Sequence, residues 1–177
     1  YASDTSTASP KGPLTALAYL NAGAGNLSYG YTAGGSTNFG ATDRTQVDRV
    51  DYGNDTATAS PKGPLVQGGR KLTATGNASS GYWAGGTSPD NSVIQKIDYS
   101  NDTATSVAKG PLTSTRNSFA SFSAPGHGYF TGGTPSSTVE RMDYANDTAQ
   151  ATAKGPLSLA RGYNSGVSAQ DIGGALN

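Results

Sequence analysis

One phrase, Lys-Gly-Pro-Leu, recurs along this chain of 177 residues and constrains the fold more than any other feature. It stands at residues 11–14, 62–65, 109–112 and 154–157, and a Tyr precedes each Lys by ten residues, at Tyr1, Tyr52, Tyr99 and Tyr144. A diglycine follows three of the four Lys residues at one constant interval, at residues 34–35, 85–86 and 132–133. Such fixed spacing marks a repeat protein, in which each period is one structural unit packed against the next.

The period shortens along the chain, and all of the change falls between the diglycine and the next Val-rich run. The connections concerned are 36–44, 87–91 and 134–136. Length variation confined to one connection is typical of a surface loop on a constant scaffold. We therefore expect a single repeat domain over 1–177, with repeats at about 1–51, 52–98, 99–143 and 144–177, the last of them incomplete.

The local patterns predict short strands separated by turns. The runs 46–52, 93–99 and 139–144 show the partial alternation of half-buried strands. The Asn-Asp-Thr that follows each run is turn chemistry, because short Asn and Asp side chains bond to nearby backbone. Pro in the recurring phrase belongs at a strand end, since it cannot donate to a ladder. No segment sustains a period of 3.6 residues, so the sequence predicts an all-β chain.

The repeat resembles the kelch family. Kelch blades have an aromatic strand ending in diglycine, a Val-rich strand ending in Tyr-Asp, a turn, a Leu-Pro segment and an Arg. Residues 129–133, 139–144, 154–157 and Arg161 follow that order, with Asp and Tyr reversed and with the only Trp, Trp83, in an aromatic strand instead of after the turn. The resemblance implies kelch-like β-propeller blades, each a four-stranded antiparallel sheet, with about three full repeats and one split or incomplete blade.

A second resemblance concerns wording. The sequence Asp-Tyr-x-Asn-Asp-Thr-Ala, together with Lys-Gly-Pro-Leu, is similar to repeat arrays of marine bacteriophage structural and tail-fibre-like proteins. It implies an extracellular or virion location and a structural role.

The ends of the chain leave three arrangements open. Residues 1–14 could supply outer strands, and 158–177 inner strands, of one composite blade that closes a ring of four. The unfinished ends could instead pair between molecules and form a head-to-tail filament. In the third arrangement these repeats belong to a larger propeller.

Composition excludes several classes of function. The formal net charge of zero gives no electrostatic basis for a nucleic-acid partner. The absence of cysteine excludes disulfides and thiolate metal sites. No apolar run approaches the roughly 20 residues that span a bilayer, so we expect no membrane insertion.

Catalytic chemistry finds little support in the sequence. The only histidine, His127, lies in an expected loop and has no nucleophile or carboxylate at a recognisable spacing. The paired acids, Asp98 with Asp102 for example, are interpreted as turn residues in preference to calcium ligands. Between strands, Arg70, Arg116 and Arg161 are the expected partners of these carboxylates. We expect no enzyme activity, no cofactor and no metal.

Two groups of residues are candidates for binding or modification. Aromatic side chains next to the diglycines could stack on sugars or fill the core; they are Tyr31, Tyr82, Trp83, Tyr129 and Phe130. Asn-x-Thr sequons at Asn54, Asn101 and Asn146 would accept glycans in a eukaryotic secreted protein and are plain turn residues otherwise.

These observations favour a non-enzymatic structural or adhesion module of a virion fibre or other extracellular assembly, which presents variable loops on a propeller scaffold. Its expected partners are other copies of itself or other structural proteins. The alternative is a carbohydrate-binding, lectin-like propeller that recognises surface glycans.

Overall fold

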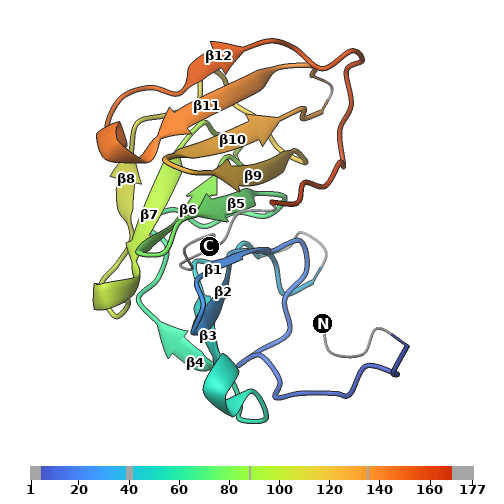
Figure 1. The fold of residues 1–177 in the computed structure, drawn as a ribbon, viewed down its shortest axis with the longest axis vertical. Coiled ribbons are helices and arrows are strands. Elements are labelled where there is room, and N and C mark those ends of the chain that lie inside the picture. Colours follow the sequence, from blue (N-terminus) through green and yellow to red (C-terminus); the bar gives the residue numbers. More distant parts are fainter. Residues whose placement is uncertain (1–4, 39–41, 88, 135, 169–177) are drawn as a thin grey trace, which may run out of the picture.

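The structure is a computed structural model, and it describes residues 5–38, 42–87, 89–134 and 136–168. These residues form three four-stranded antiparallel sheets, with no helix beyond three single 3-10 turns (Figure 1). The predicted all-β class and the four-stranded antiparallel sheets are confirmed.

Each sheet follows the chain order of its strands. The first sheet contains β1 (Ala22–Gly25), β2 (Tyr29–Ala33), β3 (Val47–Asp51) and β4 (Ser60–Lys62). The second contains β5 (Thr73–Gly76), β6 (Ser80–Ala84), β7 (Ile94–Asp98) and β8 (Val107–Lys109). The third contains β9 (Ala120–Ala124), β10 (His127–Thr131), β11 (Val139–Asp143) and β12 (Thr152–Lys154).

The repeated sequence phrases occupy the same place in every sheet. The Val-rich runs form the third strands, β3, β7 and β11, as expected. After each comes a 3-10 turn, η1 (Tyr52–Asn54), η2 (Tyr99–Asn101) or η3 (Tyr144–Asn146). The chain then returns along the third strand as the short fourth strand, which ends at the Lys of Lys-Gly-Pro-Leu.

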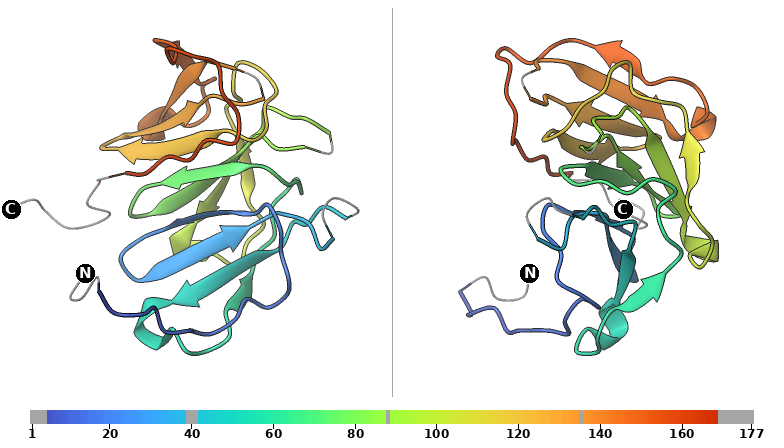
Figure 2. Two further views of the ribbon diagram at one scale, coloured as in Figure 1. Left: turned by 90° about the vertical axis from the view of Figure 1, so that its right-hand side faces the viewer. Right: turned by 180° about the vertical axis from the view of Figure 1, so that it is seen from behind.

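The three sheets stack face to face, with their first strands side by side. β1 lies against β5, and β5 lies against β9 (Figures 1 and 2). The first strands of all three sheets and residues 166–168 line a shared cavity of about 300 Å³.

Two hydrophobic cores fill the space between neighbouring sheets. Between the first and second sheets, Tyr31, Val47 and Leu65 pack against Trp83 and Ile97. Between the second and third sheets, a similar core contains Tyr82, Ile94, Leu112, Phe130 and Met142. Burying one such side chain contributes about 1.5–3 kcal/mol, so the contacts between sheets supply much of the folding energy.

The diglycine at the end of each second strand has a backbone requirement. Gly85 and Gly86 have φ angles of +61° and +114°, in the region that side chains disfavour. The turn there brings the Gly86 amide to the carbonyl oxygen of Arg116, at 2.8 Å, in the segment leading to the next sheet. The diglycine thus joins two sheets as well as ending a strand.

The described residues contain no fourth sheet, and neither 5–14 nor 158–168 forms a strand. Residues 158–168 nevertheless continue the stack, because the Tyr163 amide donates to the Ser118 carbonyl just as the Ser118 amide donates to that of Lys71. The rest of the composite blade expected from the sequence, at 1–4 and 169–177, lies outside the described residues. No helix in the described ranges has the length and apolar character needed to cross a membrane.

Candidate functional site

The first aspartate of each repeated acidic pair caps the 3-10 turn. The Oδ1 atom of Asp51 accepts from the Gly53 amide at 2.8 Å, and Asp98 and Asp143 cap their turns in the same way. A carboxylate that satisfies free amides at a turn start is a local stabilising device. The interpretation of these residues as turn formers is confirmed.

The second aspartate of the pair reaches the neighbouring sheet. Asp102, at the end of the turn after β7, accepts a hydrogen bond from the Tyr31 hydroxyl at 2.9 Å. Its Oδ2 lies 2.7 Å from Arg49 Nη1, and its Oδ1 lies 3.3 Å from Lys62 Nζ. All three partners belong to the first sheet.

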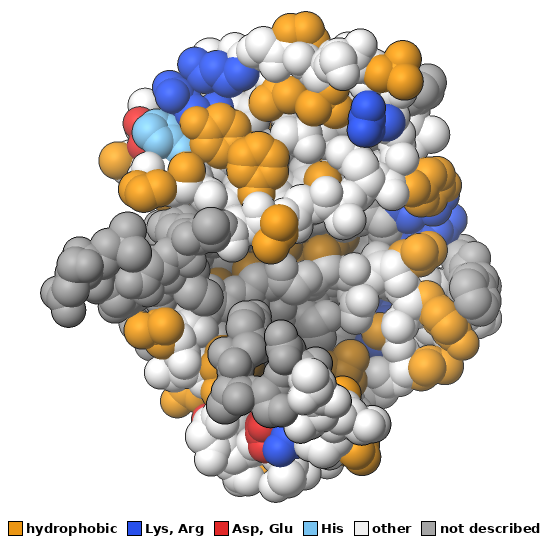
Figure 3. Space-filling view, turned by 45° about the vertical axis from the view of Figure 1, so that its right-hand side comes forward, with side chains coloured by type: hydrophobic (Ala, Val, Ile, Leu, Met, Phe, Trp, Pro, Cys, Tyr) orange, Lys and Arg blue, Asp and Glu red, His pale blue; other side chains and the backbone are white. Residues whose placement is uncertain are grey.

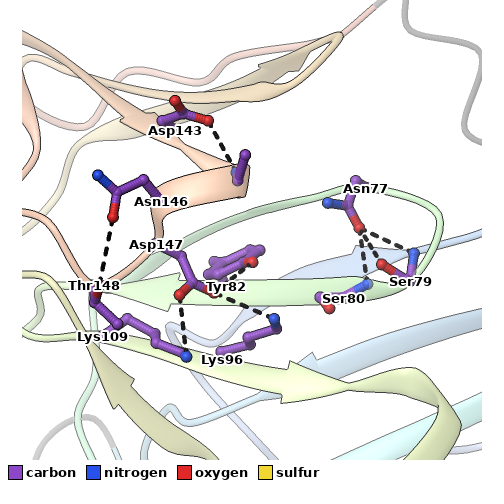
Figure 4. Close-up of polar contacts among 11 residues, drawn as sticks. Asn77, Ser79, Ser80, Tyr82, Lys96, Lys109, Asp143, Asn146, Asp147 and Thr148 are labelled. Atoms are coloured by element: carbon purple, nitrogen blue, oxygen red, sulfur yellow. Dashed lines mark hydrogen bonds and ion pairs between the residues drawn. The ribbon is translucent and has the colours of Figure 1, made fainter.

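Asp147 makes the same arrangement on the second sheet (Figure 4). It accepts from the Tyr82 hydroxyl at 3.0 Å, and its oxygens lie 3.2 Å from Lys96 Nζ and 3.1 Å from Lys109 Nζ. The recurrence shows that the contact belongs to the repeat and is not an isolated ion pair.

These carboxylates are charged in the folded protein. Burial alone would raise the pKa of Asp102, but the Tyr31 hydrogen bond and the charges of Arg49 and Lys62 outweigh it and lower that pKa below its ordinary value. Asp147 has a lowered pKa for the same reason, with Lys109, Lys96 and Tyr82 outweighing burial.

The backbone completes the contact. The Gly63 amide donates to the Asp102 carbonyl at 2.9 Å, and the Ser106 amide donates to the Pro64 carbonyl at 2.9 Å. A Cβ atom on Gly63 would overlap the carbonyl of Ala104, so this approach requires glycine. The turn tyrosine adds a stacked ring, Tyr99 on Tyr31, with centroids 4.6 Å apart.

We call the group of residues that binds the second aspartate an aspartate socket. It consists of the Tyr of the second strand, the basic residue of the third strand, and the Lys-Gly-Pro that begins at the last residue of the fourth strand. The first sheet's socket is Tyr31, Arg49 and 62–64, and it holds Asp102. The second sheet's socket is Tyr82, Lys96 and 109–111, and it holds Asp147, with the Gly110 amide donating to the Asp147 carbonyl at 2.8 Å.

The third sheet has the same socket without its aspartate. It consists of Tyr129, Arg141 and 154–156. Within the described parts of the chain, no carboxylate lies on Arg141 or Lys154, and a Cβ on Gly155 would meet nothing within 4 Å. Phe122 stacks on Tyr129, with centroids 5.2 Å apart.

The sockets were not predicted from the sequence, and the expected pairing of the repeated acids with Arg70, Arg116 and Arg161 is wrong. Arg70 pairs with Asp43, at 2.8 Å, and Arg116 pairs with the buried Glu140. Arg161 makes no ion pair in the described ranges. One feature of the sequence could have indicated the sockets: the Tyr, the basic residue, the Lys and the Asp occupy equivalent positions in successive repeats.

Most of the candidate aromatic residues lie inside the protein. Tyr31, Tyr82, Trp83 and Phe130 are at most 2% exposed and pack in the two cores. A sugar could stack on them only if the sheets separated. Tyr129 is half-buried, because no sheet covers the face of the third sheet on which it lies.

The remaining candidates lie at the surface or at its edge. The sequon residues Asn54, Asn101 and Asn146 are exposed at the ends of their 3-10 turns. His127, expected in a loop, is instead the first residue of β10, and its Nδ1 lies 3.2 Å from the Pro125 carbonyl oxygen. The described residues hold no group of three or more His, Cys, Asp or Glu side chains placed to bind a metal.

Comparison with known proteins adds no relative. No protein-family model matches the chain, and a search of curated proteins finds no match. The kelch-like resemblance therefore rests on the sequence pattern.

Proposed function

We propose that the three sheets are kelch-like blades of a β-propeller and that the chain is a non-enzymatic structural or adhesion module. In this role it belongs to a virion fibre or another extracellular assembly, and it presents variable loops on a constant scaffold. Other copies of the chain, or other structural proteins, are its partners.

The observation that carries the proposal is the separation of constant from variable features. The constant features join the sheets: the aspartate sockets, the stacked tyrosines and the diglycine turns. The length changes fall only in the connections between the second and third strands, 36–44, 87–91 and 134–136. Because equivalent strands are connected, these loops emerge from equivalent strand ends, which suits presentation to a partner.

Support for the propeller form comes from the packing. Successive sheets touch through their faces, and their first strands gather around a shared cavity. Antiparallel four-stranded sheets arranged radially about a channel are the architecture of a propeller.

Imaging of the native assembly tests the role. An antibody raised against the purified chain should label the surface of the virion or other extracellular assembly in electron micrographs. Exchanging loop 87–91 for the shorter 134–136 should change binding to a host surface and leave the melting temperature within about 2 °C, since loop changes cost little stability. Absence of the antibody label from every purified virion or extracellular assembly would refute the proposal.

The alternative function is carbohydrate binding, and one observation favours it. Phe122 and Tyr129 present stacked rings on an uncovered sheet face, beside Arg141 (Figure 3 shows hydrophobic side chains beside basic ones over the third sheet). Rings of this kind bind sugar faces. A glycan array with the wild type and a Tyr129→Ala variant tests this function, with Tyr52→Ala, an exposed tyrosine on the first sheet's turn, as the matched control.

A further inference from the structure

The third aspartate socket faces an open side of the molecule and has a charge of its own. Arg141 is half-buried and Lys154 is exposed, whereas the corresponding Lys62 and Lys109 are enclosed by an aspartate-bearing turn. Two cations and a tyrosine hydroxyl gathered on one face form a site for a carboxylate.

The backbone of Gly155 and Pro156 in this socket has no partner among the described residues. In the occupied sockets, Gly63 and Gly110 lie directly against the incoming Ala104 and Ala149 carbonyls, and the following Pro carbonyls accept the amides of Ser106 and Ala151. At the third socket, a Cβ on Gly155 meets nothing within 4 Å. The described residues supply no donor to the Pro156 carbonyl.

The occupied sockets identify the chemistry of the missing partner. Each receives a turn of the form Tyr-x-Asn-Asp-Thr-Ala, which delivers one carboxylate, one carbonyl and one tyrosine ring. The chain carries a fourth such segment at its start, where Tyr1 and Asp4 precede Thr5 with the same spacing. Besides the two complete pairs and the contact at Lys11, the sequence therefore contains one further Asp-bearing segment and one further socket.

Residues 11–12 and the third socket lie at opposite ends of the stack. The Lys11 ammonium lies 3.3 Å from Asp55, and the Gly12 amide donates to the Asp55 carbonyl at 2.7 Å, which places residues 11–12 against the first sheet. The outer face of that sheet bears an apolar cavity of about 530 Å³, lined by Leu14, Val50 and Tyr52 among others. β12 lies at the far end (Figure 1). In the described part of the chain, no further sheet covers the outer face of either end of the stack.

We propose that the third socket, Tyr129, Arg141 and 154–156, binds the N-terminal segment of a second copy of this chain, with Asp4 of that copy as the bound carboxylate. The contact is heterologous, so repeated association builds an open array. The inference rests on the proposed role as an assembly module and names the surface through which the copies join.

A glycine substitution tests the socket directly. Gly155→Ala should leave folding unchanged, since the added Cβ meets no atom, and should abolish self-association by blocking the approach of the turn. Thr152→Ala is the matched control, because the equivalent Val107 stays 58% exposed beside an occupied socket. Sedimentation velocity over a concentration series measures association, and the melting curve measures folding. Association of Gly155→Ala at wild-type strength would overturn the proposal, as would a wild type that stays monomeric throughout.

Charge exchange separates binding of a second copy from closure within one chain. Lys154→Glu and Asp4→Lys should each weaken association at least about tenfold. Mixing the two variants should restore it, because each then meets a complementary partner. If both single variants lower the melting temperature of a monomeric protein and the double variant Lys154→Glu, Asp4→Lys recovers it, the contact closes within one chain, and the proposal is overturned. Imaging of the native assembly tests the proposed role independently of these variants. A failure of the socket contact can therefore be distinguished from a failure of the proposed role.

Discussion

The substitution Asp102→Asn tests whether an aspartate socket holds two sheets together. The variant keeps the shape of the side chain and its turn but removes the charge, so Arg49 and Lys62 face a neutral amide. The Asp102 side chain is 8% exposed, and the side chains of its partners Arg49 and Lys62 are 23% and 12% exposed. The cations lose their counter-charge in a site that water reaches only partly.

The expected loss follows from that burial. Breaking a fully buried pair costs about 3–5 kcal/mol. Partial solvent contact at Arg49 reduces this, and hydrogen bonds to charged groups contribute about 1.5–3 kcal/mol, so we expect a loss of about 2–3 kcal/mol. For a chain of this size each kcal/mol shifts the melting temperature by about 2–4 °C, which gives a decrease of about 4–12 °C.

Thermal unfolding followed by circular dichroism measures the shift, with Asp55→Asn as the control. Asp55 occupies the same turn position but is 40% exposed, and its carboxylate lies 3.3 Å from the Lys11 ammonium, which is itself 51% exposed. An exposed pair contributes under about 1 kcal/mol. Equal destabilisation by the two substitutions would refute the reasoning, because the carboxylate would then act through its own turn and not through the neighbouring sheet.

Three further predictions follow from the same contacts. The folded-state pKa of Asp102 is lowered, so its contribution is complete above the unfolded value of about 3.9 and is lost as pH falls through the folded value; melting curves of the wild type and Asp102→Asn should converge in acid. Gly110→Ala should destabilise the fold by several kcal/mol in urea titrations, because its Cβ overlaps the Ala149 carbonyl. Trp83 is fully buried, and its indole donates to the Ala22 carbonyl at 3.0 Å. Its fluorescence should therefore have a short-wavelength maximum and resist quenching by acrylamide, and the maximum should shift to longer wavelength when the first two sheets separate.

The elements of the fold could be predicted from the sequence because their causes are local. Alternation along 93–99 marks β7, and Asp98 caps the turn that follows through an amide two residues away. The four-stranded sheets came from a resemblance, and the structure contains them. In each case the determining residues lie within one period.

The sockets could not be derived in this way, since their members lie in different periods. Tyr31 and Asp102 are 71 residues apart, and Tyr82 and Asp147 are 65 apart. Arg70 and Arg116 looked equally suitable as partners, and only the stacking of the sheets directs Arg116 to Glu140 and leaves Asp102 to Arg49. To predict which cation pairs with which carboxylate, one needs to know on which sheet face each cation lies.

The register of a repeat nevertheless carries information about its interfaces. In a stack of identical units, one unit's donor face meets the next unit's acceptor face, so both halves of every contact are present in each period. Tyr129, Arg141 and Lys154 match the phase of two occupied sockets, and their sheet lacks a following unit in the described chain. The contact that fixes the internal order of the sheets is therefore also available for joining one array to another. In the proposed assembly, equivalent residues of the repeat serve stability in the middle of the stack and recognition at its end.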